Sequence, residues 1–95
     1  MMNLLLIAAY FSTALAASPM WTSGDQAPFP KSDKTYKCQG NHYSYCTSWE
    51  YDQKHTFVWR GQCYNPTGEN GKEHGFSRND PLPTCTGGLI RCCSP

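Results

Sequence analysis

The stretch Cys85-Thr86-Gly87-Gly88-Leu89-Ile90-Arg91-Cys92-Cys93, close to the end of the chain, sets the strongest constraint on the fold. Gly87-Gly88 predicts a flexible turn, and residues 89–93 then predict a short final strand. Because neighbouring side chains of a strand point to opposite faces, we expect Cys92 and Cys93 to bond to two different partners. A bond between the two neighbours is the alternative, and it strains the peptide that links them.

The chain has six cysteines, namely Cys38, Cys46, Cys63, Cys85, Cys92 and Cys93. An even number of cysteines behind an export signal indicates a disulfide framework. Each bridge that closes a loop of tens of residues contributes about 3–4 kcal/mol, mainly by restricting the unfolded chain. The three histidines make a zinc site the alternative, but no Cys-x-x-Cys pair is present, so we expect no metal and no cofactor. The cysteine spacing does not choose among the many possible pairings.

The beginning of the chain predicts a signal peptide over residues 1–16. Residues 4–11 are apolar and uncharged, and Ala14 and Ala16 occupy the small-residue positions of a cleavage site. We expect cleavage after Ala16 or one residue later. The apolar run is shorter than the roughly 20 residues that a membrane-spanning helix needs, so we expect no membrane insertion after cleavage. These features predict a secreted, extracellular protein.

The part after the signal is poor in aliphatic side chains. Its valine, leucine and isoleucine residues are only Val58, Leu82, Leu89 and Ile90. So few aliphatic side chains cannot offset the entropy lost when a chain of this size orders, so covalent bridges are needed. The formal net charge is +1 and both signs are interspersed, which argues against a nucleic-acid partner and against a membrane-disrupting peptide.

The pattern along the chain predicts a small, disulfide-rich, mainly β domain with about three antiparallel strands and long loops. Residues 17–35 hold three prolines and no cysteine, so they predict an extended N-terminal arm, and residues 36–95 form the disulfide-stapled β domain. Residues 43–49 predict one strand and residues 55–64 the strongest strand, before the final strand described above. No helical period persists along the chain.

The aromatic side chains are the main candidates for binding. Trp and Tyr provide flat faces that stack on sugars, and they are also frequent at protein interfaces. We single out Trp21, Trp49 and Tyr51 as candidate binding residues. The alternative is that aromatic rings replace the missing aliphatic side chains in the core. We expect this for Trp59, which lies on the strongest strand beside Phe57 on the same face.

The histidines suggest an enzyme as the alternative to a binding protein. His42, His55 and His74, with Glu50 and Arg60, are the residue types that metal-free ribonucleases use for proton transfer and phosphate stabilisation. Residue types alone do not define catalytic geometry, so we expect no catalytic residue and no enzymatic activity.

Three resemblances add to these inferences. The spacing of Cys85, Cys92 and Cys93 resembles the end of β-defensin-like peptides, and it implies a three-stranded antiparallel sheet with the pairs Cys38–Cys92, Cys46–Cys85 and Cys63–Cys93. Residues 36–44 resemble an early segment of small fungal guanyl-specific ribonucleases, but no catalytic role carries over. The whole chain resembles small cysteine-rich secreted proteins of fungi, many of which are effector-like.

The sequence therefore predicts a secreted binding protein of the effector, toxin or host-defence type. We expect a monomer that acts without catalysis on an extracellular protein or glycan. A carbohydrate-binding module for chitin or glucan is one alternative, and a degenerate ribonuclease-like secreted protein is the other.

Overall fold

The computed structural model describes residues 17–95, in which the regular elements are all β-strands. The strands are β1 (Ser18–Gln26), β2 (Tyr43–Ser48), β3 (Val58–Tyr64), β4 (Thr84–Cys85) and β5 (Gly88–Cys93). Every pairing between them is antiparallel. The predicted class, a small disulfide-rich β protein, is confirmed, and its sheet has five strands. Residues 1–16, the predicted signal peptide, lie outside the described residues.

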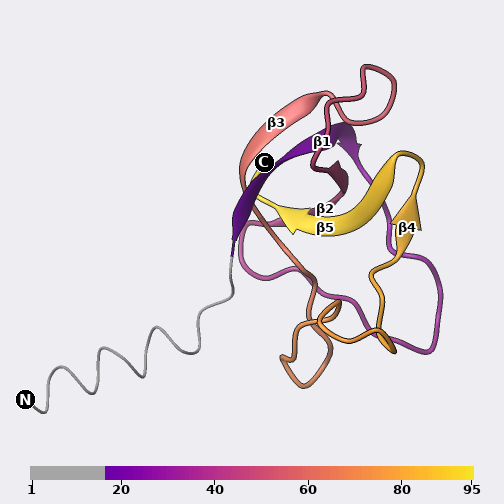
Figure 1. The fold of residues 1–95 in the computed structure, drawn as a ribbon. Coiled ribbons are helices and arrows are strands. Elements are labelled where there is room, and N and C mark those ends of the chain that lie inside the picture. The colour runs from indigo at the N-terminus through magenta and orange to yellow at the C-terminus, as the bar shows by residue number, and fades with distance from the viewer. Residues whose placement is uncertain (1–16) are drawn as a thin grey trace, which may run out of the picture.

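The sheet closes on itself. Its strand order is β2-β1-β3-β5-β4, and β2 also pairs with β5. The strands β1, β2, β3 and β5 therefore form a ring, which Figure 1 shows around a small interior. Strand β4 pairs with the beginning of β5, next to the turn that Gly87 forms with a positive φ of 94°. Within residues 17–95, no helix has the length and apolar character needed to cross a membrane.

Residues 18–26, which the sequence places in an extended arm, are extended as predicted, but they form β1 between β2 and β3. Met20 and Thr22 of this strand point into the ring and are fully buried. This mostly polar segment lacks the aliphatic alternation that usually reveals a strand, and pairing on both of its edges makes it one. The sequence had predicted that the core begins near Tyr36, but the core also includes β1, which precedes that residue.

The interior of the ring is small, and its central cluster takes one side chain from each of β1, β2, β3 and β5. Met20, Tyr45, Cys63 and Cys93 form this buried cluster. Ile90 alternates with the inward-facing residues of β5 and is buried on the other face. One aromatic ring, one thioether and one disulfide thus occupy the space that aliphatic side chains fill in larger domains.

Three disulfides brace the ring. They join Cys38 to Cys92, Cys46 to Cys85 and Cys63 to Cys93, across 54, 39 and 30 residues of chain. This is the pairing that the β-defensin-like spacing implied, and all six cysteines are used. Cys63 and Cys93 are also direct partners in the pairing of β3 with β5. The prediction that Cys92 and Cys93 bond to different segments on the two faces of the last strand is confirmed.

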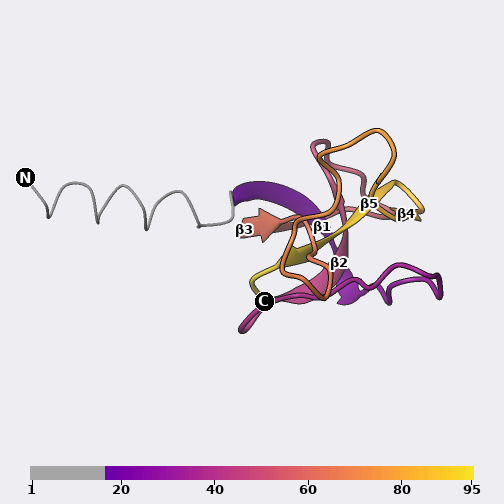
Figure 2. The same cartoon turned by 90° about the horizontal axis from the view of Figure 1, so that it is seen from below.

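Two long loops, residues 27–37 and 65–83, pack against each other beside the ring. In Figure 1 they lie below the strands, and Figure 2 is seen from that side. Lys34 pairs with Asp80 at 2.7 Å, and the His74 ring nitrogen Nε2 lies 2.6 Å from the carbonyl oxygen of Thr35. A backbone bridge between Lys37 and Thr67 adds to these contacts. The loops therefore form an ordered layer that contains no strand of the sheet.

Candidate functional site

The outer wall of β1 and β3 carries a cluster of aromatic side chains. Trp21 and Trp59 are direct partners in the pairing of these strands, and their ring centroids lie 5.1 Å apart at an interplanar angle of 65°. Trp21 points outward because its neighbours Met20 and Thr22 point into the ring. Tyr51, from the loop between β2 and β3, meets Trp21 at 5.0 Å and 76°. We name Trp21, Tyr51 and Trp59 the aromatic surface.

The aromatic surface is open to solvent. Trp59 is 55% exposed and Tyr51 is 57% exposed, while Trp21 is half-buried between them. The prediction that Trp59 packs in the core is wrong, because Met20, Tyr45 and one disulfide already fill the small interior. Adjoining apolar rings that remain exposed on a small domain are typical of an interaction site.

The structure brings together two of the three predicted binding residues. Trp21 and Tyr51 belong to the aromatic surface, whereas Trp49 follows the end of β2 and is 68% exposed. The ring of Trp49 faces the Arg91 guanidinium instead, with its centroid 5.9 Å from Cζ. The sequence analysis placed Trp59 in the core, so Trp59 was not among the predicted binding residues. Two large rings on one strand face, Phe57 and Trp59, were the available signal of an aromatic outer surface, and both rings are exposed.

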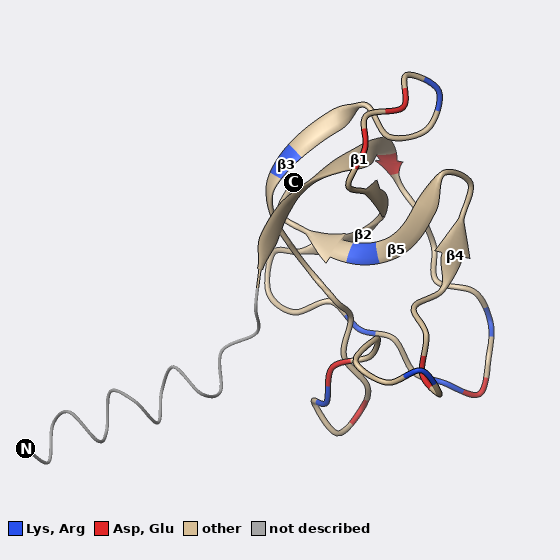
Figure 3. Ribbon diagram, in the orientation of Figure 1, with Lys and Arg blue, Asp and Glu red and all other residues tan. Residues whose placement is uncertain are grey.

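Two arginines point from the strands toward the inside of the ring. A register shift between β1 and β3 sets two residues of β1 opposite three of β3, and it brings Arg60 to the same face as Cys63. Arg60 places its Cζ 3.9 Å from the centroid of the Tyr45 ring, and its Nε donates a hydrogen bond to Thr22 Oγ1 at 2.8 Å. Figure 3 shows that charged residues are otherwise concentrated in the loops, with few on the strands.

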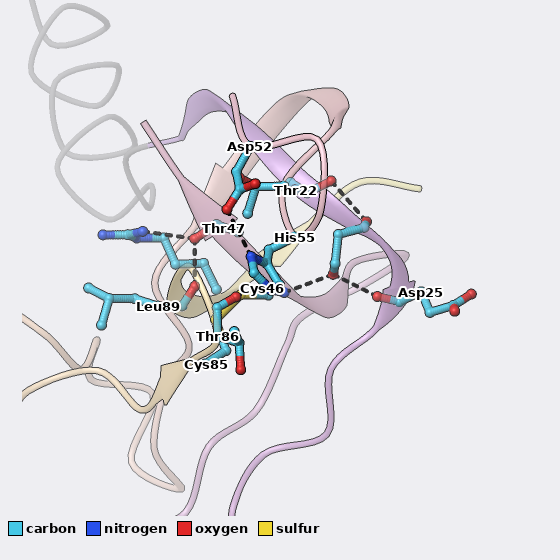
Figure 4. Close-up of a disulfide and its surroundings, with 12 residues drawn as sticks. Thr22, Asp25, Cys46, Thr47, Asp52, His55, Cys85, Thr86 and Leu89 are labelled. Carbon is cyan, nitrogen blue, oxygen red and sulfur yellow. Dashed lines mark hydrogen bonds and ion pairs between the residues drawn. A yellow bond between two sulfur atoms is a disulfide. The ribbon is translucent and has the colours of Figure 1, made fainter. Parts of the chain in front are cut away.

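Arg91 of β5 has a similar environment. Its Nη1 donates to Thr47 Oγ1 at 2.8 Å, and Thr47 in turn donates to the carbonyl oxygen of Leu89 at 2.7 Å. Figure 4 shows Thr47 and Leu89 close to the Cys46–Cys85 disulfide. Burial lowers the pKa of the Arg91 guanidinium from its usual value. Among residues 17–95, neither Arg60 nor Arg91 forms an ion pair with a carboxylate.

The three histidines lie in separate environments. The His42 ring contacts Tyr64, with ring centroids 4.9 Å apart. His55 pairs with Asp52 at 2.8 Å beside the Cys46–Cys85 disulfide, as Figure 4 shows. His74 instead belongs to the loop layer. The described part of the chain holds no group of three or more His, Cys, Asp or Glu residues able to bind a metal ion.

Hydrogen bonds lower the pKa of the two carboxylates that lie next to His55 and His74. Bonds from Lys34 and His74 hold the pKa of Asp80 below its usual value. Bonds from His55 and the backbone of Lys54 likewise lower the pKa of Asp52. Both carboxylates are therefore charged at neutral pH, and Asp80 links the two long loops.

The geometry defines a small, antiparallel β protein that is closed by strand pairing and braced by disulfides. Its three disulfides fit an extracellular environment, since such bonds persist where the surroundings are oxidising. No model of a known protein family matches the chain, and neither a curated protein nor a solved structure matches it.

Proposed function

We propose that the protein is a secreted, non-catalytic binding domain of the effector, toxin or host-defence type, and that its aromatic surface binds an extracellular protein. The observation that carries this proposal is the exposed contact of Trp59 and Tyr51 with Trp21 on the outer wall of the ring. Large rigid rings bury much area at little cost in side-chain entropy, which is why they dominate the energetics of protein interfaces.

The angles between the rings favour a protein partner over a flat polysaccharide. Trp59 and Tyr51 are inclined at 65° and 76° to Trp21, so the three rings do not form one plane. A chitin or glucan surface offers flat sugar faces, and parallel rings would match them better. Inclined rings instead form an uneven surface into which the side chains of a protein partner can fit.

The experiment compares capture of extracellular proteins by the native domain, by Trp59→Ala and by Tyr43→Ala. Tyr43 is the control, because its ring is exposed at the start of β2, whereas Trp21 of the aromatic surface pairs with Ser48 at the other end of that strand. We expect a partner that the native domain and the Tyr43 variant bind, and for which the affinity of the Trp59 variant is at least about tenfold lower. Both variants should keep their folds, since the Trp59 and Tyr43 side chains are 55% and 43% exposed.

The same three proteins are then tested for co-sedimentation with insoluble chitin and β-glucan. Sedimentation of the native domain that fails for the Trp59 variant would replace the protein partner with a glycan. Equal capture of every partner by the native domain and the Trp59 variant would overturn the assignment of the aromatic surface.

A further inference from the structure

A second concave site lies between β5 and the loop of residues 65–83, apart from the aromatic surface. It has a volume of about 400 Å³, and its wall includes Asn65, Phe76, Arg78, Leu82, Leu89 and Arg91. Volumes of this order suit a small organic ligand or the end of a chain. We name it the arginine pocket.

The Arg91 side chain is held in a fixed position at this pocket. Its Nε donates to Asn65 Oδ1 at 3.2 Å, and its Nη1 donates to Thr47 Oγ1 at 2.8 Å. Nη2 has no acceptor among residues 17–95, and no side-chain nitrogen of these residues is both fully buried and without a partner. Nη2 is therefore accessible to solvent. A guanidinium that is already oriented loses little further freedom when it binds a ligand.

The charged groups that line the pocket are all positive. Arg78 and Arg91 belong to its wall, no acidic residue does, and neither arginine forms an ion pair within residues 17–95. Asp80 comes directly before Pro81 of the wall, but its carboxylate is already bound by Lys34 and His74. The pocket therefore has a net positive charge that the described part of the protein does not neutralise.

The rest of the wall is mainly apolar. Phe76 and Leu82 contribute from the loop, and Leu89 contributes from β5. Gly75, with a φ of 91°, brings the loop backbone close, because a Cβ atom there would lie 3.0 Å from Leu82 Cγ and 2.9 Å from Asn65 Nδ2. A tight glycine turn thus holds the apolar wall against the residue that orients Arg91.

We propose that the arginine pocket binds a carboxylate that is attached to an apolar body. The guanidinium of Arg91 would donate from Nη2 to the carboxylate, with Arg78 adding attraction at the rim, while the apolar body contacts Phe76 and Leu82. Charge-assisted hydrogen bonds of this kind are about twice as strong as neutral ones. The ligand is either a free apolar carboxylic acid or the terminal carboxylate of a peptide that ends in an apolar residue.

The test titrates the oxidised protein with 4-phenylbutyrate and follows binding by calorimetry and by NMR shifts. We expect a dissociation constant of about 1 mM, as is typical of so small a ligand. The amide 4-phenylbutyramide, which keeps the shape but lacks the charge, is expected to bind at least about tenfold more weakly. N-acetylphenylalanine and its amide form the second arm, because they imitate a peptide end.

Substitutions in the pocket wall test whether the ligand binds there. Arg91→Lys keeps the charge but loses the oriented Nη2 donor, and we expect it to weaken 4-phenylbutyrate binding about tenfold. Ser77→Asp places a competing carboxylate in the pocket wall and should weaken binding at least as much. Ser32→Asp is its control, because Ser32 and Ser77 each accept a hydrogen bond from the backbone of the residue two positions ahead, at 3.2 and 3.1 Å.

Each outcome decides the proposal. Binding that depends on charge, is lost in Ser77→Asp and is kept in Ser32→Asp supports it, and the tighter of the two arms identifies the source of the carboxylate. Equal binding of acid and amide, no binding at 20 mM ligand, or equal binding of inorganic phosphate overturns it. Trp59→Ala leaves this site intact, so failure here is distinguishable from failure of the proposed protein partner.

Discussion

Gly88, the first residue of β5, illustrates how closely the backbones of this small ring approach one another. A Cβ atom at this position would collide with the carbonyl oxygen of Thr47 on β2. The contact involves backbone, which cannot move aside as a flexible side chain can. Glycine is therefore required here for close approach, and not for an unusual φ.

We predict that Gly88→Ala lowers the free energy of unfolding by about 3 kcal/mol, because the added methyl group forces β5 away from β2. Gly61→Ala is the control, since a Cβ atom there would meet nothing within 4 Å. That variant should differ from the native protein by less than about 0.5 kcal/mol. Urea titrations of both variants measure the difference, and equal stabilities would show that the two backbones are not in close contact.

The single residue Asp80 also makes the stability of the fold depend on pH. Its folded pKa is depressed by Lys34 and His74, so the stabilisation is present above the unfolded pKa of about 3.9. It is lost as the pH falls below that value and through the folded pKa. We predict that the stability of the native protein declines in this acid range and that Asp80→Asn declines less steeply.

Thermal unfolding between pH 2 and 6 measures this slope for both proteins. Asp33→Asn is the control, because Asp33 is exposed and forms no ion pair among the described residues. Asp52 retains its own share of the pH dependence in every variant. Identical acid slopes for the native protein and Asp80→Asn would contradict the prediction.

At the scale of single elements, β1 has the most unexpected position. It pairs with β2 on one edge and with β3 on the other, and it delivers Met20 to the centre of the core. The remaining strands form an open sheet without it. Residue 18, at the start of β1, lies one or two residues after the predicted cleavage site, so cleavage there would leave β1 at the very beginning of the mature chain.

We predict that Met20→Ala costs about 3 kcal/mol of stability, as is usual for emptying a fully buried position. Met20 is 1% exposed, whereas Gln26 at the end of the same strand is exposed, so Gln26→Ala serves as the control. Chemical denaturation of the oxidised proteins gives the comparison. A mobile arm outside the core would leave the stability of both variants unchanged.

At the scale of the whole molecule, covalent bonds compensate for a core too small to stabilise the fold alone. The Cys38–Cys92 bridge spans 54 residues and ties the segment before β2 to the last strand. The Cys63–Cys93 bridge is part of the core itself. Domains of this size generally need such covalent support.

We predict that the reduced protein is largely unfolded at room temperature and that the double variant Cys38→Ala/Cys92→Ala loses about 4 kcal/mol. Circular dichroism and mass spectrometry, before and after reduction, test both statements. The native mass should be six hydrogens below the reduced mass, in keeping with three disulfides. A reduced protein that keeps its β structure would contradict the prediction.

The sequence by itself determined the class of this protein and much of its framework. The even number of cysteines and the scarcity of aliphatic residues predicted a disulfide-rich domain, because so few aliphatic side chains could not stabilise the fold. The adjacency of Cys92 and Cys93 predicted disulfides to two different segments, since neighbouring side chains of a strand point to opposite faces in any context. The strands near Tyr45 and Cys63 were also predicted, although the second begins at Val58 rather than at residue 55.

Only the tertiary structure decided which side chains face inward and which segments close the ring. Whether Trp59 is buried depends on the size of the interior, and that size depends on how many strands close around it. Strand β1 became recognisable only through its two neighbours, because its own residues carry too weak a local preference. The arginine pocket combines Arg91 with Phe76 and Leu82 of a distant loop. Such a combination arises from long-range packing, which local sequence patterns do not encode.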